Sequence, residues 1–283
     1  MKITKTFVSL FLMTFLIGFV AVPTTKKEIN ISIETATILL EKMPTPPIES
    51  STKKESIEEI VDWQEGDKIK FKIKLLETGE EFHGDQINAK SGETWLGLFK
   101  KNDKYVLQTT KLKIVNVHDT IVDEEDGKTG KSVFTNNKAQ AVLLLQNAKM
   151  LREGEVKTVF FAGETDESTE LKNGSEKSFE FNGEKYNLRV ENKISSDEFL
   201  GKGSKLTLSH NGTEQILNYL KDGCNDCYWN LYWVGDIDQD GKLDFYFDLS
   251  WHYNVTDKKL FLSSQAEKGK LVKYVANFWT NGC

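Results

Sequence analysis

Proline is absent from the chain after Pro47, and arginine occurs only at positions 152 and 189. Almost all of the positive charge is therefore lysine, the formal net charge is −6, and no basic stretch alternates with aromatic residues. A domain that binds nucleic acid usually carries such a basic surface, so the composition argues against a nucleic-acid partner. An acidic, lysine-rich surface mainly serves solubility.

Motifs that would identify an enzyme are also missing. The four histidines are scattered, with no HExxH pattern, and no serine lies in a nucleophile elbow. The segment 127–132 (GKTGKS) lacks the first glycine of a phosphate-binding loop, because Glu125 stands at that position. The acidic run 123–127 is best interpreted as a solvated turn, with a weak cation site as the alternative.

The only long apolar run is at the N-terminus. Lys2 and Lys5 precede an apolar stretch over residues 7–22 that has a plausible cleavage point at its end. This arrangement predicts a signal peptide over residues 1–22, with an uncleaved anchor as the alternative. We therefore expect an exported protein of the periplasm or the extracellular cell envelope, with no transmembrane domain after cleavage.

The remaining chain divides by composition. The four prolines lie between residues 23 and 47, in a polar stretch with few aromatic residues. Such a composition is typical of a tether, here residues 23–57. After it we expect two β modules, residues 58–152 and 153–283, or one continuous domain over residues 58–283.

Alternating apolar and polar residues indicate strands beyond the tether. The stretch 68–75 (KIKFKIKL) predicts a strand with one buried face, and residues 139–151 fit either a buried strand or a short helix. Asn-Gly pairs at 182–183 and 211–212 predict hairpin turns, because both turn positions need φ > 0. Further strands are predicted at 105–107, 112–117, 156–161, 178–181, 186–190 and 205–208. The fold class is therefore mainly β, with sandwich or barrel-like modules.

The acidic segment 235–247 (GDIDQDGKLDFYF) has the chemistry of a cation-binding loop. Carboxylates at alternate positions turn toward one point, and the glycine that follows takes the positive φ that lets the next carbonyl face the same point. This set of hard oxygen ligands fits Ca²⁺. The expected ligands are Asp236, Asp238, Asp240, the backbone carbonyl of Lys242, and Asp244 either directly or through a water. The alternative is an acidic turn without an ion, in which these carboxylates would repel one another.

The motif Gly-Asp-x-Asp-x-Asp-Gly-x-x-Asp, between flanks rich in aromatic residues, resembles the calcium loop of FG-GAP/VCBS-type repeats. An EF-hand would need an acidic residue at position 247, where this chain has Phe247. The motif occurs once, so the resemblance does not imply a propeller of repeats. With the later segments 252–254, 260–264 and 282–283, the loop also resembles a group of uncharacterised exported bacterial proteins, which implies no activity.

Three cysteines fit an oxidising compartment. Cys224 and Cys227 form a CxxC pattern, and Cys283 is the last residue. The preferred interpretation is a disulfide that joins Cys283 to one of the pair. A local bond between Cys224 and Cys227 is the alternative, and a zinc or redox role is a further one.

Two classes of function follow. The first is an exported, calcium-stabilised β protein of the cell envelope that acts as a structural or binding module, with carbohydrate or an envelope protein as partner. Four aromatic residues near the acidic loop would form a sugar-stacking platform or belong to the core: Trp229, Trp233, Trp251 and Tyr253. The second class is an envelope hydrolase whose catalytic residues come together only in the fold.

Overall fold

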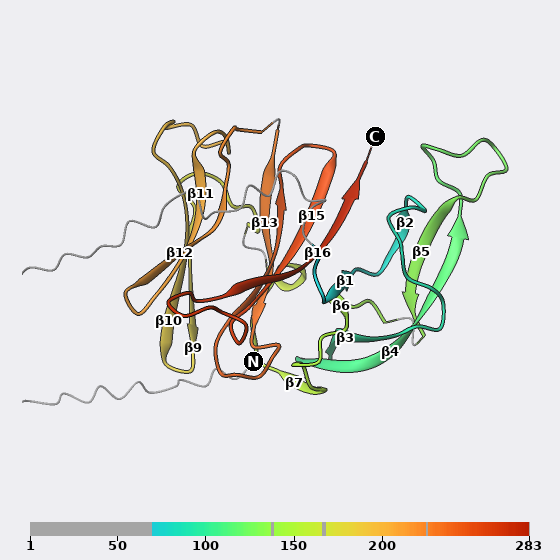
Figure 1. The fold of residues 1–283 in the computed structure, drawn as a ribbon, viewed down its shortest axis with the longest axis horizontal. Helices are drawn as coiled ribbons and strands as arrows, with labels where there is room; N and C mark the ends of the chain where they lie inside the picture. Colours follow the sequence, from blue (N-terminus) through green and yellow to red (C-terminus); the bar gives the residue numbers. More distant parts are fainter. Residues whose placement is uncertain (1–69, 137–138, 166–167, 225, 283) are drawn as a thin grey trace, which may run out of the picture. The chain divides into compact units, whose positions relative to one another are not determined.

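The computed structural model describes residues 70–136, 139–165, 168–224 and 226–282, which all fall in one compact unit, Glu55–Cys283. The predicted signal peptide and tether, as well as Cys283, lie outside the described residues. The described part is mainly β and built from antiparallel sheets, as the sequence predicts (Figure 1). Within it, no helix has the length and apolar character needed to cross a membrane.

A seven-stranded sheet has the strand order β1-β6-β3-β4-β5-β2, with β7 paired to β4. Its strands are β1 (Lys74–Leu76), β2 (Gly79–Phe82), β3 (Thr94–Lys101), β4 (Lys104–Val117), β5 (Gly130–Thr135), β6 (Leu143–Gln146) and β7 (Gly154–Val156).

A five-stranded sheet follows with the order β16-β15-β14-β13-β8, and a four-stranded sheet has the order β12-β11-β10-β9. The strands of the five-stranded sheet are β8 (Thr158–Phe161), β13 (Tyr228–Gly235), β14 (Asp244–Ser250), β15 (Val255–Leu262) and β16 (Lys273–Asn281). Those of the four-stranded sheet are β9 (Glu176–Phe181), β10 (Glu184–Asn192), β11 (Ser204–His210) and β12 (Thr213–Tyr219). A short 3-10 turn, η2 (Ala162–Glu164), comes directly after β8.

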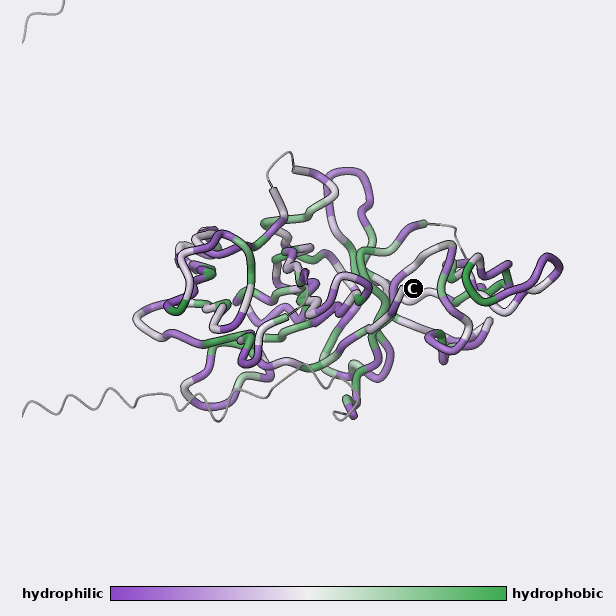
Figure 2. The backbone as a smooth tube through the Cα atoms, turned by 90° about the horizontal axis from the view of Figure 1, so that it is seen from above, coloured by the Kyte–Doolittle hydropathy of each residue, from purple (hydrophilic) through white to green (hydrophobic). Residues whose placement is uncertain are grey.

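The five-stranded sheet contributes to both hydrophobic clusters of the described core. Phe245 and Phe247 lie in the cluster shared with the four-stranded sheet, whereas Tyr246 between them lies in the cluster shared with the seven-stranded sheet. Neighbouring residues on a strand point to opposite faces, so this sheet is covered on both faces, and every residue of β14 is buried. Figure 2 shows hydrophilic residues in many of the outer turns.

The cluster shared with the seven-stranded sheet draws residues from both of the predicted β modules. Leu98 and Leu143 come from the N-terminal one, and Tyr246 and Leu260 from the C-terminal one. The division of the body at residue 153 stays a prediction.

The strand predicted over residues 68–75 is wrong for residues 70–73, which lie outside any strand. β1 begins only at Lys74, where Leu75 finds a partner in Leu145 of β6. The alternation of burial is nevertheless present, because Ile73 and Leu75 are buried on either side of the exposed Lys74. Alternation reports which side chains are buried, whereas a strand also needs a hydrogen-bonded neighbour.

The other predicted strands are found, with changed limits. Residues 105–107 and 112–117 belong to the single long strand β4, and the predicted strand 156–161 is divided between β7 and β8. The ambiguous stretch 139–151 contains the strand β6. Both hairpin turns are confirmed, with φ values of 51° and 81° at Asn182 and Gly183 and of 46° and 77° at Asn211 and Gly212.

The disulfide of the structure joins Cys224 to Cys227, with 5.6 Å between their Cα atoms. The preferred pairing of Cys283 with one of these two therefore does not occur, and the structure holds the local alternative. The turn between the two cysteines, with φ 49° at Asp226, brings their Cα atoms into the range that a disulfide requires. Such a bond is typical of proteins in oxidising compartments.

Candidate metal centre

The acidic loop connects β13, which ends at Gly235, to β14, which begins at Asp244. The flanking strands form as their aromatic and β-branched sequences predict. Gly241 has φ 88°, the left-handed conformation expected of it, and Gln239 adopts φ 57° two residues earlier. These two left-handed residues curl the loop, so that its alternate aspartates turn inward.

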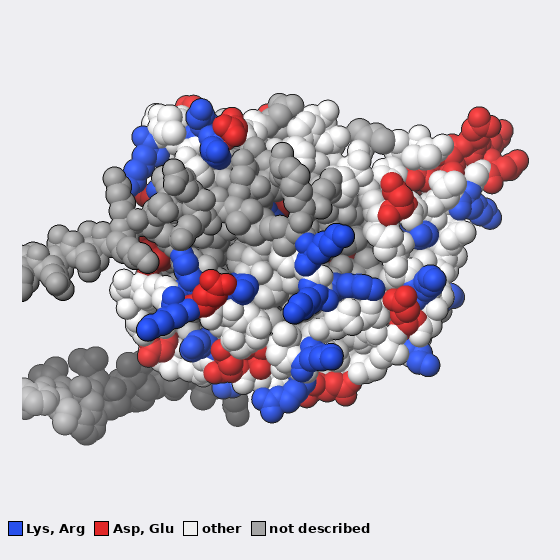
Figure 3. Space-filling view, in the orientation of Figure 1, with Lys and Arg blue, Asp and Glu red and all other residues white. Residues whose placement is uncertain are grey.

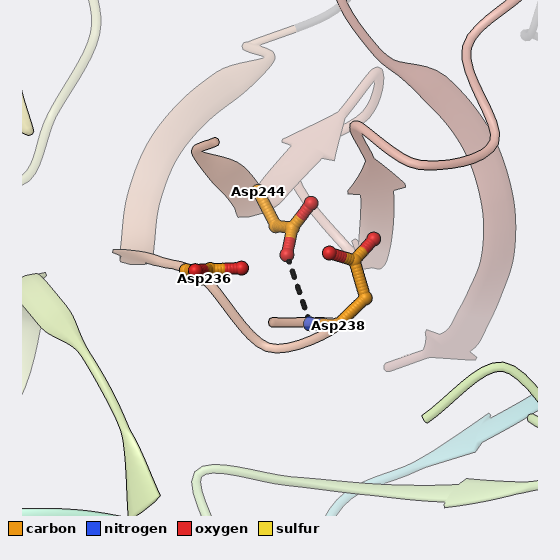
Figure 4. A group of neighbouring side chains, drawn as sticks. All are labelled: Asp236, Asp238 and Asp244. Atoms are coloured by element: carbon orange, nitrogen blue, oxygen red, sulfur yellow. Dashed lines mark hydrogen bonds between the residues drawn. The ribbon is translucent and has the colours of Figure 1, made fainter. Parts of the chain in front are cut away.

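Three of the predicted ligands form the centre of the loop. Asp236, Asp238 and Asp244 are buried, and each offers a carboxylate oxygen within 4.8 Å of the others. Figure 4 shows the three carboxylates facing a common space. The dashed line marks the backbone N–H of Asp238 donating to Oδ2 of Asp244 at 3.3 Å. The group consists of oxygen donors alone, and it can hold a metal ion.

Asp240 and Lys242 lie at the exposed rim of the loop. Oδ1 of Asp240 accepts hydrogen bonds from the backbone N–H of Lys242 at 2.9 Å and from the Ser263 hydroxyl at 3.0 Å. Asp240 therefore shapes the turn and is not one of the three clustered carboxylates. The roles predicted for its carboxylate and for the Lys242 carbonyl as ligands stay predictions.

Asp244 fastens the loop to the end of β15. Its Oδ2 accepts from the backbone N–H of Ile237 at 2.8 Å, and its Oδ1 accepts from the backbone N–H of Ser263 at 2.7 Å. The same Oδ1 lies 2.9 Å from the Ser263 hydroxyl, whose single proton it shares with Asp240. The side chain is fully buried, so its polar atoms depend on these partners.

Ser263 and Ser264 are site residues that the sequence analysis does not identify. Besides the bonds from Ser263, the backbone N–H of Ser264 donates to Oδ2 of Asp238 at 3.2 Å. Both serines follow β15, and the pairing of Phe261 with Phe245 places the end of β15 beside the start of β14. In the sequence, the only sign of these residues is a serine pair at the end of an apolar run. That pattern does not reveal which strand lies beside it.

Contacts from the segments that flank other strands also hold the loop. The Asn182 amide donates to the carbonyl of Gly241 at 2.9 Å from the β9–β10 turn, and the Gln239 amide donates to the carbonyl of Arg152 at 3.1 Å. The backbone N–H of Asp236 donates to the carbonyl of Lys157 at 2.9 Å, just before β8. The loop is thus hydrogen-bonded to segments that flank strands of the other sheets, so it is not a free surface turn.

Burial raises the pKa of all three central carboxyl groups. For Asp236 and Asp238, the negative charges of neighbouring aspartates raise the pKa further, although backbone N–H groups partly oppose this. The pKa of Asp244 lies well above its ordinary value because of burial and, next, the charge of Asp238. The ion pairs among the described residues involve none of these three carboxylates. A cation bound among the three carboxylates would offset both the cost of burying their charge and the repulsion between them.

Of the four aromatic residues that the sequence places near the loop, only Trp251 and Tyr253 are accessible to a sugar, and Trp251 is half-buried. Trp229 and Trp233 are fully buried and belong to the core, where the Trp233 indole N–H donates to the Thr158 hydroxyl at 3.0 Å. Tyr253 is 57% exposed and remains at the surface. The alternative, that such residues are core, is therefore correct for the two buried tryptophans.

Comparisons of this chain with protein families, with curated proteins and with solved structures found no match.

Proposed function

We propose that the loop between β13 and β14 binds Ca²⁺, and that the protein is an exported, calcium-stabilised β protein of the cell envelope with a structural or binding role. One observation carries the proposal: Asp236, Asp238 and Asp244 are buried together, with ligand oxygens within 4.8 Å and no ion pair to a described lysine or arginine. Burying several carboxylates is costly unless a positive charge compensates them. The envelope hydrolase remains the alternative prediction.

The donor set favours calcium over other common metals. Zinc sites in proteins usually include cysteine or histidine, whereas this group is composed of carboxylates. Magnesium demands a near-ideal octahedron and gives up its waters reluctantly. Calcium accepts about 6 to 8 oxygens in flexible geometry, which suits a curled loop that can add water and backbone carbonyls to three carboxylates.

The bound ion would act as a clamp on the five-stranded sheet. Asp236 and Asp238 directly follow β13, Asp244 opens β14, and Ser263 connects Asp244 to the end of β15. An ion held by Asp236, Asp238 and Asp244 would therefore fix the ends of three adjacent strands, β13, β14 and β15. Because β14 is buried on both faces, order at this junction supports both clusters of the core.

Export is part of the same proposal. The predicted signal peptide and the disulfide between Cys224 and Cys227 both fit an oxidising compartment. N-terminal sequencing of the protein isolated from its native envelope should find a first residue between Val22 and Lys26. Recovery of Met1 on membrane-bound protein would contradict cleavage.

The direct test is calorimetric titration of the chelator-treated protein with CaCl₂. We expect one binding site per chain, and we expect its heat to disappear in the double variant Asp236→Asn/Asp238→Asn, which keeps side-chain shape but removes two charges. The matched control is Asp119→Asn/Asp123→Asn, which removes two carboxylates from the β4–β5 loop. Calcium binding that persists in the first variant, or that is lost in the second, would contradict the proposed site.

A further inference from the structure

The two most exposed large apolar side chains of the described chain lie in one loop. Phe199 is 75% exposed and Ile194 is 68% exposed, and both belong to residues 193–203, which connect β10 to β11. Apolar residues that are exposed singly are common on proteins and need no explanation. Two in the same short loop form a candidate contact surface.

Polar side chains fasten both ends of this β10–β11 loop from within. The Asn192 side chain accepts from the backbone N–H of Ile194 at 2.8 Å and donates to the carbonyl of Lys202 at 3.0 Å. The hydroxyl of Ser204, a buried residue, accepts from the Asn192 amide at 3.3 Å and donates to the Asn173 side chain at 2.9 Å. The two ends of the loop are therefore tied together and linked to Asn173.

Asn173, which precedes β9, also fixes the middle of the loop. Its backbone N–H donates to the carbonyl of Glu198 at 3.0 Å. Its side-chain amide donates to the carbonyl of Asp197 at 3.0 Å and to that of Phe199. Polar groups of the loop thus find partners on its inner side, whereas the side chains of Ile194 and Phe199 stay at the surface. Their exposure belongs to a loop that is hydrogen-bonded at both ends and in the middle.

Gly203 supports the side chain of Ile194. Its φ of 92° is a conformation that glycine adopts without strain. A Cβ at this position would come within 2.6 Å of Cδ1 of Ile194, so the isoleucine side chain lies close to the Gly203 backbone. One side of Ile194 therefore rests on the loop, and the rest of the side chain remains exposed.

Lysines flank this apolar pair. Lys193 directly precedes Ile194, and Lys202 lies beside the supporting Gly203; both lysines are exposed and belong to no ion pair among the described residues. Of the two acidic residues of the loop, Glu198 is already paired with Lys172 at 2.7 Å. The loop is therefore locally positive, although the formal net charge of the chain is −6.

A second pair of exposed apolar side chains provides a contrast. Ile121 and Val122 of the β4–β5 loop are 56% and 64% exposed. The exposed carboxylates of Glu124, Glu125 and Asp126 follow them directly in the chain after Asp123. An anionic surface would repel these carboxylates and attract the lysines of the β10–β11 loop. Charge thus separates two loops that are similar in apolar exposure.

We propose that the β10–β11 loop docks the protein on an anionic lipid surface, with Phe199 and Ile194 inserted at the level of the headgroups and Lys193 and Lys202 at the lipid phosphates. Apolar side chains gain by entering the boundary between headgroups and acyl chains, and lysines are attracted by anionic lipids. One loop buries few apolar groups, so the attachment is weak and reversible. The rival occupant, an apolar pocket of a partner protein, gives the flanking lysines no role.

The test is co-sedimentation of the full chain with lipid vesicles, in chelator and at low salt. One set of vesicles is phosphatidylcholine alone, and the other contains phosphatidylcholine and phosphatidylglycerol in equal parts. We expect binding to the anionic vesicles, and Ile194→Ser/Phe199→Ser should lower the partition coefficient by about tenfold or more, because both apolar side chains lose their burial in lipid. The matched control Ile121→Ser/Val122→Ser also removes two exposed apolar side chains and should bind as the native chain does.

Two further variants separate the contributions of charge and of apolar surface. Lys193→Gln/Lys202→Gln should weaken binding to the anionic vesicles by about tenfold or more at low salt. Phe199→Trp should keep the binding, because tryptophan favours the membrane interface.

Failure of the native chain to bind the anionic vesicles would overturn the proposal and leave a protein as the occupant. Binding that survives Ile194→Ser/Phe199→Ser, an equal loss in the control, or equal binding to the neutral vesicles would overturn it as well. Because chelator is present throughout, these outcomes are independent of the proposed calcium site.

Discussion

Two acidic loops of the described chain, β13–β14 and β4–β5, use their carboxylates in opposite ways. In the β13–β14 loop, the carboxylates of Asp236, Asp238 and Asp244 face one another, and burial raises their pKa values. In the β4–β5 loop, hydrogen bonds hold the pKa values of Asp119 and Asp123 below their ordinary range. Figure 3 shows acidic side chains gathered where this second loop projects into solvent.

The carboxylates of the β4–β5 loop are each satisfied by the protein itself. Asp119 accepts from the backbone N–H groups of Ile121 and Val122 and pairs with Nδ1 of His83 at 2.6 Å. Asp123 accepts from the backbone N–H of Asp119 and from both the N–H and the hydroxyl of Thr129. These bonds organise a surface turn, in agreement with the solvated turn that the sequence favours for residues 123–127.

The comparison shows that the number of acidic residues does not make a cation site. The β4–β5 loop has the denser run of acidic residues, but the carboxylates of Asp119 and Asp123 accept from separate donors. The β13–β14 loop concentrates three carboxylates on one buried space. The mutual orientation of the carboxylates therefore distinguishes a candidate metal centre from a turn whose carboxylates each have their own donors.

The largest expected effect comes from Asp244→Ala. The change leaves the buried N–H groups of Ile237 and Ser263 without their acceptor, so the free energy of unfolding in chelator should fall by about 3 kcal/mol or more. Urea denaturation measures the difference. The control is Asp240→Ala in the same loop, whose carboxylate is exposed at the rim. A loss no greater than that of the control would contradict the central role of Asp244.

Calcium should have the next largest effect. At a concentration of about 100 times its dissociation constant, it should stabilise the protein by about 2.7 kcal/mol, or roughly 5 to 10 °C in melting temperature. Magnesium should give a smaller shift. The increase should vanish in Asp236→Asn/Asp238→Asn and persist in Asp119→Asn/Asp123→Asn. If both double variants lose the calcium response, the distinction between the loops fails.

The pH dependence of stability should differ in sign between the two loops. Without a cation, the folded-state pKa values of Asp236, Asp238 and Asp244 are raised, so the folded protein binds more protons than the unfolded chain. Its stability therefore falls as the pH rises from about 4 through those raised pKa values. Asp119 and Asp123 have lowered pKa values, so their contribution is present above about pH 4 and is lost at lower pH.

Melting curves in chelator between pH 4 and pH 8 test this sign. As the pH falls, the melting temperature of the native chain should rise relative to that of Asp236→Asn/Asp238→Asn. Excess calcium should remove that gain, because the ion competes with protons for the same oxygens. If the native chain instead lost stability relative to the variant on acidification in chelator, the protein would already compensate the charge of these carboxylates without a metal.

The smallest effect should follow from His83→Ala. Loss of the imidazole removes the strongest cause of the lowered pKa of Asp119, so that pKa should rise toward its ordinary value. NMR titration of the Asp119 carboxyl measures the change. Calcium affinity should stay constant, because His83 and Asp119 belong to the other loop. A changed calcium affinity would show that the two loops are coupled.

The sequence alone determined the local features of this protein. Alternating side chains, Asn-Gly pairs and aromatic runs predict most strands and both hairpin turns, because these signals act between near neighbours on the chain. The spacing of Asp236, Asp238 and Gly241 likewise predicts the curled acidic loop and the left-handed glycine. The strand predicted over residues 68–75 fails where alternation finds no partner strand.

The tertiary structure alone decided which of these features become a site. It places Ser263 and Ser264 against the acidic loop, moves Asp240 to the rim, and buries Trp229 and Trp233 in the core. It also selects the bond between Cys224 and Cys227 from the pairings that the sequence leaves open. The position of the two serines and the burial of the two tryptophans depend on contacts between strands far apart in sequence. Burial and strand neighbours are properties of the folded chain that no local pattern encodes.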